Sequence, residues 1–299
     1  MLLLAVITVQ IGVFGLFHPT HLRVEAPPQQ VLLINGTLKH SIDLEWNAAP
    51  AEITARDGGQ TDFALSVPGK IQRHFRGKLF ISTVGDELVP IVTMDLEQAV
   101  TAVVAAEYPD GTHIETLKAG AVLARSYYIA SRKRHQAFEF CDTTHCQFHR
   151  APPSRQHAAT KATQATAGLT ITYQNRTFAP LYSASCGGST RTAAGVGLQS
   201  DPYPYFSVDC PACRRSSPVW THRIEMEVIP SEQFRLAQKI PSNNFSVDKS
   251  THMIHGRGEG HGVGLCQLGS NSMAAGGASF RDILNHYYPN TTCSPFSQP

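Results

Sequence analysis

The sequence lacks an excess of charge of either sign. Its 299 residues include 25 lysines and arginines against 23 aspartates and glutamates, for a formal net charge of +2. The longest basic run is the three residues 132–134, which are typical of a solvated helix end. Nucleic-acid-binding domains usually carry a clustered basic patch. The composition therefore argues against a nucleic-acid partner.

The chain also lacks internal repeats, low-complexity tracts and any linker that would divide it. Hydrophobic residues make up 42% of the sequence, which is enough to form a core. Strand patterns come first, helical patterns follow, and further strands come last, an order typical of an α+β fold. We therefore predict one α+β domain over residues 9–299, with a helical core and a mostly β subdomain over about 9–94.

The apolar N-terminal segment lacks a basic residue before it, and Gln10 interrupts it. Both features weaken its interpretation as a secretory signal or a membrane span. The alternative is a buried first strand over Val9–Phe14. Residues 1–8 are then either a shortened export signal or a lead-in to this strand, and membrane association is left open.

Hydrophobic periodicity changes from two to 3.6 residues near Asp95. This period predicts helices at residues 95–108 and 114–135, and further helices are expected at 155–167, 267–275 and 280–288. In the second of these, Lys118 and Arg125 are expected to lie away from the core. A hairpin is expected to turn at residues 174–176, and residues 193–218 are expected to form a loop region rich in glycine and proline.

Five cysteines and histidines lie within fifteen residues: His135, Cys141, His145, Cys146 and His149. Two thiolates and two imidazoles are a sufficient tetrahedral set for Zn²⁺. His145 and Cys146 are adjacent, so both could bind one ion only if the backbone turns between them. A Cys141–Cys146 disulfide and free buried thiols are the alternatives.

A second group of cysteines comprises Cys186, which precedes two glycines, and the Cys-x-x-Cys pair Cys210 and Cys213. A redox pair would be expected at a helix start, which the neighbouring prolines do not suggest. A Cys210–Cys213 disulfide and a second metal cluster that includes Cys186 both stay open.

Glu107 follows Val103 and Val104 by four and three residues, which points it toward the apolar side of its helix. Burial would raise the pKa of this carboxyl group and let it act as a general acid. The alternative is an ordinary glutamate at a frayed helix end.

Four segments together resemble the stage II sporulation protein D family of peptidoglycan lytic transglycosylases. The first is LEQAVTAVVAAEYPDGTHIETLKAGAVLARSYYIA at 96–130, and CDTTHCQ, YSASCGGST and GEGHGVGLCQLGSNSMAAGGASFRDILNHYYPNTT follow in the family's order. The sequence departs from the family pattern at Ala99, Gly120, Leu123, Cys186 and Cys266.

The resemblance implies a role for each of three sets of residues. Glu107 falls on the catalytic glutamate, and the family's zinc ligands fall on His135, Cys141, His145 and Cys146, as a structural Zn²⁺ site. The implied substrate contacts are Lys118, Arg125, Tyr127, Ser185, Gly187, Gly188, His261, Gly262, Gly264 and Gln267. The glycines would let the backbone approach sugar rings; the alternative is a tight turn that His261 caps.

The resemblance also implies an activity. The enzyme would cleave peptidoglycan strands, stripped of stem peptides, between N-acetylmuramic acid and N-acetylglucosamine to leave 1,6-anhydro ends. It would act outside the cytoplasm at the cell envelope, with a cell-wall amidase as a further partner. A glycan-binding amidase enhancer without turnover and a zinc hydrolase centred on the Cys/His cluster are the alternatives.

Overall fold

The computed structural model describes residues 7–48, 50–150, 153–154, 156–224, 228 and 230–296. Its contacts divide the chain into two compact units. Unit 1 consists of Met1–Pro109 and Ser131–Ala167, and unit 2 of Asp110–Ala130 and Gly168–Pro299. Both units combine helices with strands, so the predicted α+β class is confirmed. The division does not follow the expected subdomain boundary near residue 94, because unit 1 also takes in a helix on either side of unit 2's first segment.

Unit 1 contains most of the strands. They are β1 (Thr8–Gly12), β2 (His21–Glu25), β3 (Leu32–Ile34), β4 (Thr37–Lys39), β5 (Ser41–Glu45), β6 (Ala51–Thr54), β7 (Thr61–Val67), β8 (Ile71–Val84), β9 (Glu87–Asp95) and β10 (Phe140–Cys141). The helices are α1 (Leu96–Glu107) and α3 (Ala158–Ala165), with short 3-10 turns η1 (Gly15–Phe17) and η2 (Trp46–Ala48).

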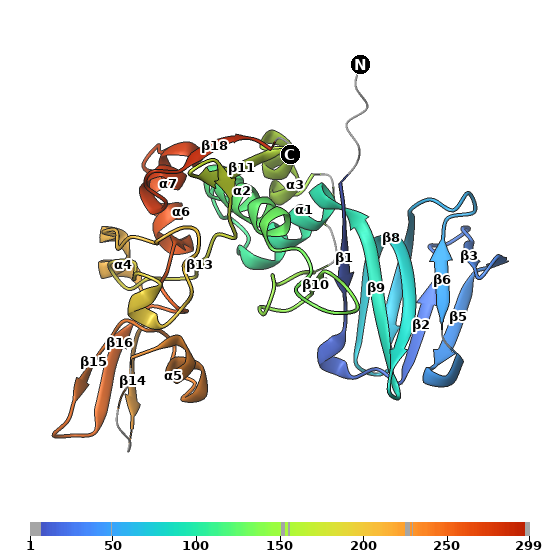
Figure 1. Cartoon of the computed structure of the whole chain (residues 1–299), viewed down its shortest axis with the longest axis horizontal. Helices are drawn as coiled ribbons and strands as arrows, with labels where there is room; N and C mark the ends of the chain where they lie inside the picture. Colours follow the sequence, from blue (N-terminus) through green and yellow to red (C-terminus); the bar gives the residue numbers. More distant parts are fainter. Residues whose placement is uncertain are drawn as a thin grey trace. The chain divides into compact units, whose positions relative to one another are not determined.

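The first strand pairs with strands from both chain segments of unit 1. Val9 and Ile11 of β1 are fully buried, which confirms the predicted first strand, although it begins at Thr8 and ends at Gly12. β1 pairs antiparallel with β9 and parallel with β10 (Figure 1). This pairing places Cys141, at the end of β10, beside Gly12.

Helix α1 follows β9 without a loop, and Asp95 is its N-cap in an extended conformation. Its buried face includes Val100, Val103 and Val104. The helix ends at Glu107 because the following Tyr108 is extended, as expected for a residue before proline. The third predicted helix is shorter than expected and corresponds to α3, which packs against α1.

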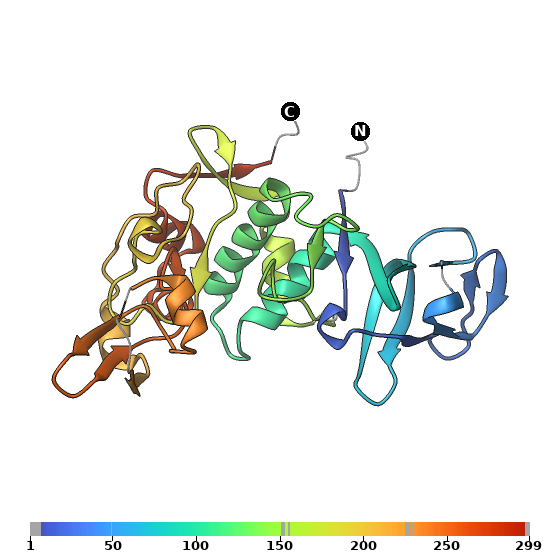
Figure 2. The same cartoon turned by 60° about the horizontal axis from the view of Figure 1, so that its bottom comes forward.

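Unit 2 alternates short strands and helices. Its helices are α2 (Ile114–Ala130), α4 (Pro211–Ser216), α5 (Glu232–Ala237), α6 (Gln267–Ala275) and α7 (Phe280–Tyr287), with a 3-10 turn η3 (Ala194–Val196). Its strands are β11 (Leu169–Tyr173), β12 (Arg176–Thr177), β13 (Tyr182–Ser183), β14 (Val219–Arg223), β15 (Phe245–Asp248), β16 (Met253–Arg257), β17 (Leu265–Cys266) and β18 (Thr292–Pro295). The β15–β16 hairpin, drawn in orange, pairs with β14 in a small sheet (Figures 1 and 2).

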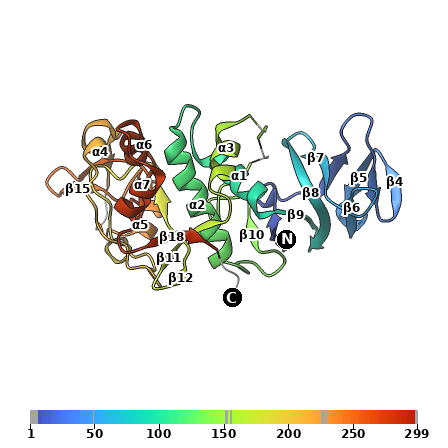
Figure 3. The same ribbon diagram turned by 90° about the horizontal axis from the view of Figure 1, so that it is seen from above.

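Helix α2 is the centre of unit 2 and contacts β11, α6 and α7 (Figure 3). It ends at Ala130, five residues before the predicted end. Arg125 is completely buried on this helix and donates hydrogen bonds to the carbonyls of Ala121 and Leu169. The prediction that Arg125 lies away from the core is therefore wrong: its guanidinium is satisfied by backbone oxygens within unit 2.

The predicted hairpin turns at Gln174 and Asn175, both with positive φ. The predicted loop over 193–218 contains α4, which the sequence did not indicate. Pro211 is the first residue of this helix, where the missing N–H costs nothing, so proline favours a helix start here. Among the described residues, no helix has the length and apolar character that a membrane span needs.

Candidate active site and metal centre

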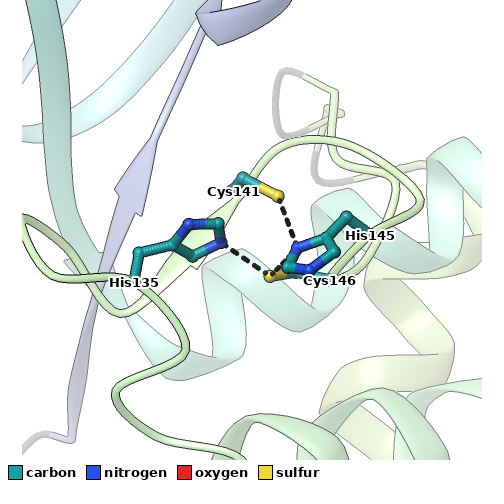
Figure 4. Close-up of side chains that lie close together, drawn as sticks. All are labelled: His135, Cys141, His145 and Cys146. Atoms are coloured by element: carbon teal, nitrogen blue, oxygen red, sulfur yellow. Dashed lines mark hydrogen bonds between the residues drawn. The ribbon is translucent and has the colours of Figure 1, made fainter.

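Four side chains of unit 1 converge in the segment around β10 (Figure 4). His135 precedes β10, Cys141 is its last residue, and His145 and Cys146 follow in the next turn. The ligand atoms of all four lie within 4.8 Å of one another. Figure 4 shows the two rings and two sulfur atoms pointing toward a common centre.

The distances within this cluster suit a tetrahedral zinc ion. His135 Nε2 lies 3.3 Å from Cys146 Sγ, and His145 Nδ1 lies 3.6 Å from Cys146 Sγ and 3.7 Å from Cys141 Sγ. Zn–S bonds of about 2.3 Å and Zn–N bonds of about 2.0 Å imply N···S edges of about 3.5 Å in a tetrahedron. The donor set therefore fits Zn²⁺ and fills all four positions.

A turn lets the neighbouring residues His145 and Cys146 face the same point. The backbone N–H of Cys146 donates to the carbonyl of Thr143, and that of His145 donates to the Thr143 hydroxyl. The same hydroxyl lies 3.2 Å from Cys141 Sγ. The backbone therefore turns at His145 and Cys146, as it must if both residues are to bind one ion.

Both cysteines of this cluster are free thiols. Hydrogen bonding by Cys146 lowers the pKa of the Cys141 thiol to about 3, with Thr143 and His145 contributing. The same pairing, together with burial, raises the pKa of Cys146. Cys141 is therefore the more acidic thiol of the pair.

Glu107 is half-buried at the C-terminal end of α1, next to this metal loop. Its Oε1 accepts a hydrogen bond of 3.2 Å from the backbone N–H of Phe148, two residues after Cys146. A carboxylate at a helix C-terminus meets the negative end of the helix dipole, so an added N–H donor there is stabilising. The loop that carries the metal ligands thus also orients the candidate acid.

A partly buried ion pair anchors the same loop from the sheet. Arg73 of β8 lies 2.9 Å from Asp142 Oδ2, which also accepts from the N–H of Phe14. Burial raises the pKa of Asp142, and Arg73 opposes this effect. No local pattern indicated this pair, because Arg73 and Asp142 are 69 positions apart.

His149 does not join the metal cluster. It is fully buried, burial lowers its pKa to about 3, and neither ring nitrogen has a hydrogen-bond partner among the described residues. It is therefore a neutral core residue of unit 1.

The residues proposed as substrate contacts all lie in unit 2, and most are inside it. Lys118, His261 and Gln267 are half-buried; Lys118 pairs with Glu115 at 2.6 Å. The buried ones are Arg125, Tyr127, Ser185, Gly187, Gly188, Gly262 and Gly264. The half-buried residues are thus the better candidates for contact with a ligand.

Gly264 of the glycine-rich segment serves the packing of unit 2. Gly264 has φ +72°, and an added Cβ would overlap the carbonyl of Leu181 and lie 3.0 Å from the Tyr288 hydroxyl. Protein atoms, and not an open surface, occupy the space beside it. His261 Nδ1 accepts from the N–H of Val263 at 3.0 Å, and burial lowers the pKa of its ring. This geometry matches the capped tight turn that was the alternative interpretation.

Comparisons with known proteins found a family model and several relatives that are similar to this chain. A family model described as Stage II sporulation protein matches residues 85–173. An uncharacterized protein of Brachyspira hyodysenteriae is 26% identical over 260 residues, covering 72% of this chain and 70% of that protein. Stage II sporulation protein D of Bacillus subtilis is 24% identical over 260 residues, covering 68% of this chain and 76% of that protein.

A shorter similarity links the chain to the amidase enhancer of Bacillus subtilis. It is 43% identical over 49 residues, which cover 16% of this chain and 7% of that protein. The segment matched by the family model contains Glu107 and all four metal-ligand candidates of unit 1.

Proposed function

We propose, from the relationship of this chain to the stage II sporulation protein D family, that it acts on the bacterial cell wall as a lytic transglycosylase. Its substrate would be the glycan strand of peptidoglycan, already stripped of stem peptides. Because this substrate lies outside the cytoplasm, the protein would work at the cell envelope.

The observation that carries this proposal is the setting of Glu107. The side chain is half-buried at the end of a helix that is well packed, and the N–H of Phe148 holds one of its oxygens. A general acid–base catalyst needs such fixed orientation, because proton transfer requires hydrogen-bond contact with the reacting oxygen.

One carboxyl group suffices for the reaction. Protonated Glu107 gives its proton to the oxygen between N-acetylmuramic acid and N-acetylglucosamine, and the C1–O bond breaks with an oxocarbenium-like centre at C1. The resulting carboxylate then takes the proton of the C6 hydroxyl of the muramic residue, whose oxygen bonds to C1. The 1,6-anhydro ring closes, Glu107 is protonated again, and no second carboxylate is needed, unlike in most glycosidases.

His135, Cys141, His145 and Cys146 would hold a structural zinc ion. Four protein donors leave no open coordination position, and a closed site of this kind stabilises a fold without activating water. In this protein the site would fix the loop that presents the Phe148 N–H to Glu107. This arrangement argues against the zinc hydrolase alternative.

The similarity to an amidase enhancer favours a second candidate, a glycan-binding protein without turnover that assists a cell-wall amidase. The two candidates differ in one product. Only the enzyme releases fragments with 1,6-anhydro ends from purified strands.

The test is Glu107→Gln, assayed by mass spectrometry of the glycan fragments with 1,6-anhydro ends that are released from denuded strands. The substitution keeps the size of the side chain and removes its titrating proton. We expect turnover to fall by about 10²–10⁴-fold, the usual contribution of general acid–base catalysis. Sedimentation with glycan strands and the metal content should stay unchanged.

Glu97→Gln, the same change in the first turn of α1, is the matched control and should keep wild-type turnover. Retention of more than about a tenth of the turnover by Glu107→Gln would assign the proton transfer to another residue, given the usual size of the effect. Wild-type protein that sediments with strands and releases no anhydro ends would instead favour the enhancer.

A further inference from the structure

We propose that Cys186, Cys210, Cys213 and Cys266 form a second metal site in unit 2, which binds one Zn²⁺ ion through four thiolates. All four side chains are buried, and their sulfur atoms lie within 4.8 Å of one another. The proposal is independent of the reaction assigned to Glu107.

The four cysteines come from three separate segments of the chain. Cys186 follows β13, Cys210 and Cys213 flank the first turn of α4, and Cys266 ends β17 and caps α6. Parallel pairing of β13 with β17 brings the first and last segments together, since Ser183 is the register partner of Cys266. Contacts between α4 and α6 bring in the middle one.

The spacing of the sulfur atoms selects the kind of ion. Zn–S bonds of about 2.3 Å imply S···S edges of about 3.8 Å in a tetrahedron. Cys213 Sγ and Cys266 Sγ lie 3.2 Å apart, too far for a disulfide bond, which measures about 2.05 Å. In a four-iron cluster each thiolate binds a different iron and the sulfur atoms are spread around the cluster. The compact arrangement here fits a single ion.

Hydrogen-bond donors surround these sulfur atoms. Cys266 Sγ accepts from the N–H groups of Gly269 at 3.3 Å and Cys186 at 3.4 Å. The Tyr287 hydroxyl lies 3.4 Å from Cys210 Sγ. Donors placed in this way stabilise thiolates and orient metal ligands.

Gly269 makes room for this arrangement. An added Cβ would overlap both Cys210 Sγ and the Tyr287 hydroxyl. Only glycine therefore lets the first turn of α6 approach the sulfur atoms closely enough for its N–H to donate.

A metal ion would also account for the stability of the short helix α4. Helix α4 has six residues, and Cys213 is the only buried one among them. Such a short helix is marginal without tertiary support. A Zn²⁺ ion would hold it to β17 and to the Cys186 segment, and its charge would offset the repulsion between thiolates.

The experiment measures metal per chain by elemental mass spectrometry, on full-length protein purified without a histidine tag or chelator. Cys141→Ser disables the Cys/His cluster of unit 1, and Cys213→Ser disables the four-cysteine cluster. We expect two zinc ions in the wild type, one in each single variant and none in the double variant. Cys293→Ser, outside both clusters, should keep two.

A second measurement uses the wild type alone, in case Cys213→Ser fails to fold. Alkylation under native conditions, followed by peptide mapping, should leave the four cysteines protected until a chelator removes the metal. Recovery of any two of them as a disulfide would overturn the proposal. So would a Cys141→Ser protein that holds no metal, or iron accompanied by acid-labile sulfide.

Discussion

The two clusters of metal-ligand candidates differ in how the chain assembles them. The Cys/His cluster of unit 1 lies within residues 135–146, and its members range from buried to exposed. The four-cysteine cluster of unit 2 spans residues 186–266 and is buried throughout. The first can form by closing one loop, whereas the second requires unit 2 to fold around it. An ion in the first cluster would therefore hold one loop in place, and an ion in the second would stabilise the core of unit 2.

This difference predicts different consequences of losing each ion. The unit 1 loop donates to Glu107, so a zinc ion bound by the proposed Cys/His site should matter most for activity. The unit 2 cluster belongs to a core that includes Tyr287, Tyr288 and Leu265, so its zinc should matter most for stability.

The largest expected effect is on the stability of Cys213→Ser. Loss of the ion leaves three buried thiols without a metal and releases α4 from its neighbours. We expect the free energy of unfolding to fall by more than about 4 kcal/mol, the range typical of losing a structural metal. Urea denaturation measures this change. A loss below about 1 kcal/mol, the average for any substitution, would remove the distinction between the clusters.

The second effect is on the turnover of Cys146→Ser. Without its zinc, the loop should no longer hold the Phe148 N–H against Glu107. We expect about a 10–100-fold loss of activity, the usual cost of removing support around a metal or catalytic group. Strand binding by sedimentation should change little. A metal-free variant with full turnover would show that Glu107 needs no help from this loop.

A smaller effect is expected for Gly269→Ala. At an ordinary helix position alanine would be favoured over glycine by about 1 kcal/mol. Here the methyl group would enter the space of Cys210 Sγ, so we expect a destabilisation of about 1–3 kcal/mol, as for other overpacked cores, with loss of one zinc ion. Gly15→Ala, with nothing within 4 Å of the added methyl, is the control. Equal thermal stability and metal content in the two variants would argue against a metal ion bound by the four cysteines.

The smallest effect is expected for Cys293→Ser. This half-buried cysteine of β18 lies outside both clusters. Its loss should change the free energy of unfolding by about 0.5 kcal/mol or less, as for most peripheral substitutions. If urea denaturation shows a larger loss of unfolding free energy, or if zinc is lost, then replacing a cysteine destabilises this chain whether or not it belongs to a cluster.

Much of the fold was predictable from local patterns. The period of the apolar residues located α1 and the start of α2, and Pro109 marked the end of α1. The position of Arg125 was predicted wrongly. Periodicity assigns a charged side chain to the surface, and it carries no information about backbone carbonyls in the core that can accept its hydrogen bonds. Helix α4 was missed because Pro211 and its neighbouring prolines were interpreted as signs of a loop, although proline is favourable at a first helical position.

By itself the sequence indicated the Cys/His cluster as one of several alternatives, because its members lie within one short segment, and the family resemblance assigned the role of acid to Glu107. Only the tertiary structure decided which residue donates to Glu107, that Arg73 pairs with Asp142, and that four distant cysteines meet. These contacts join residues far apart in the chain, and strand pairing and core packing set their distances. Local sequence patterns carry no information about such distances.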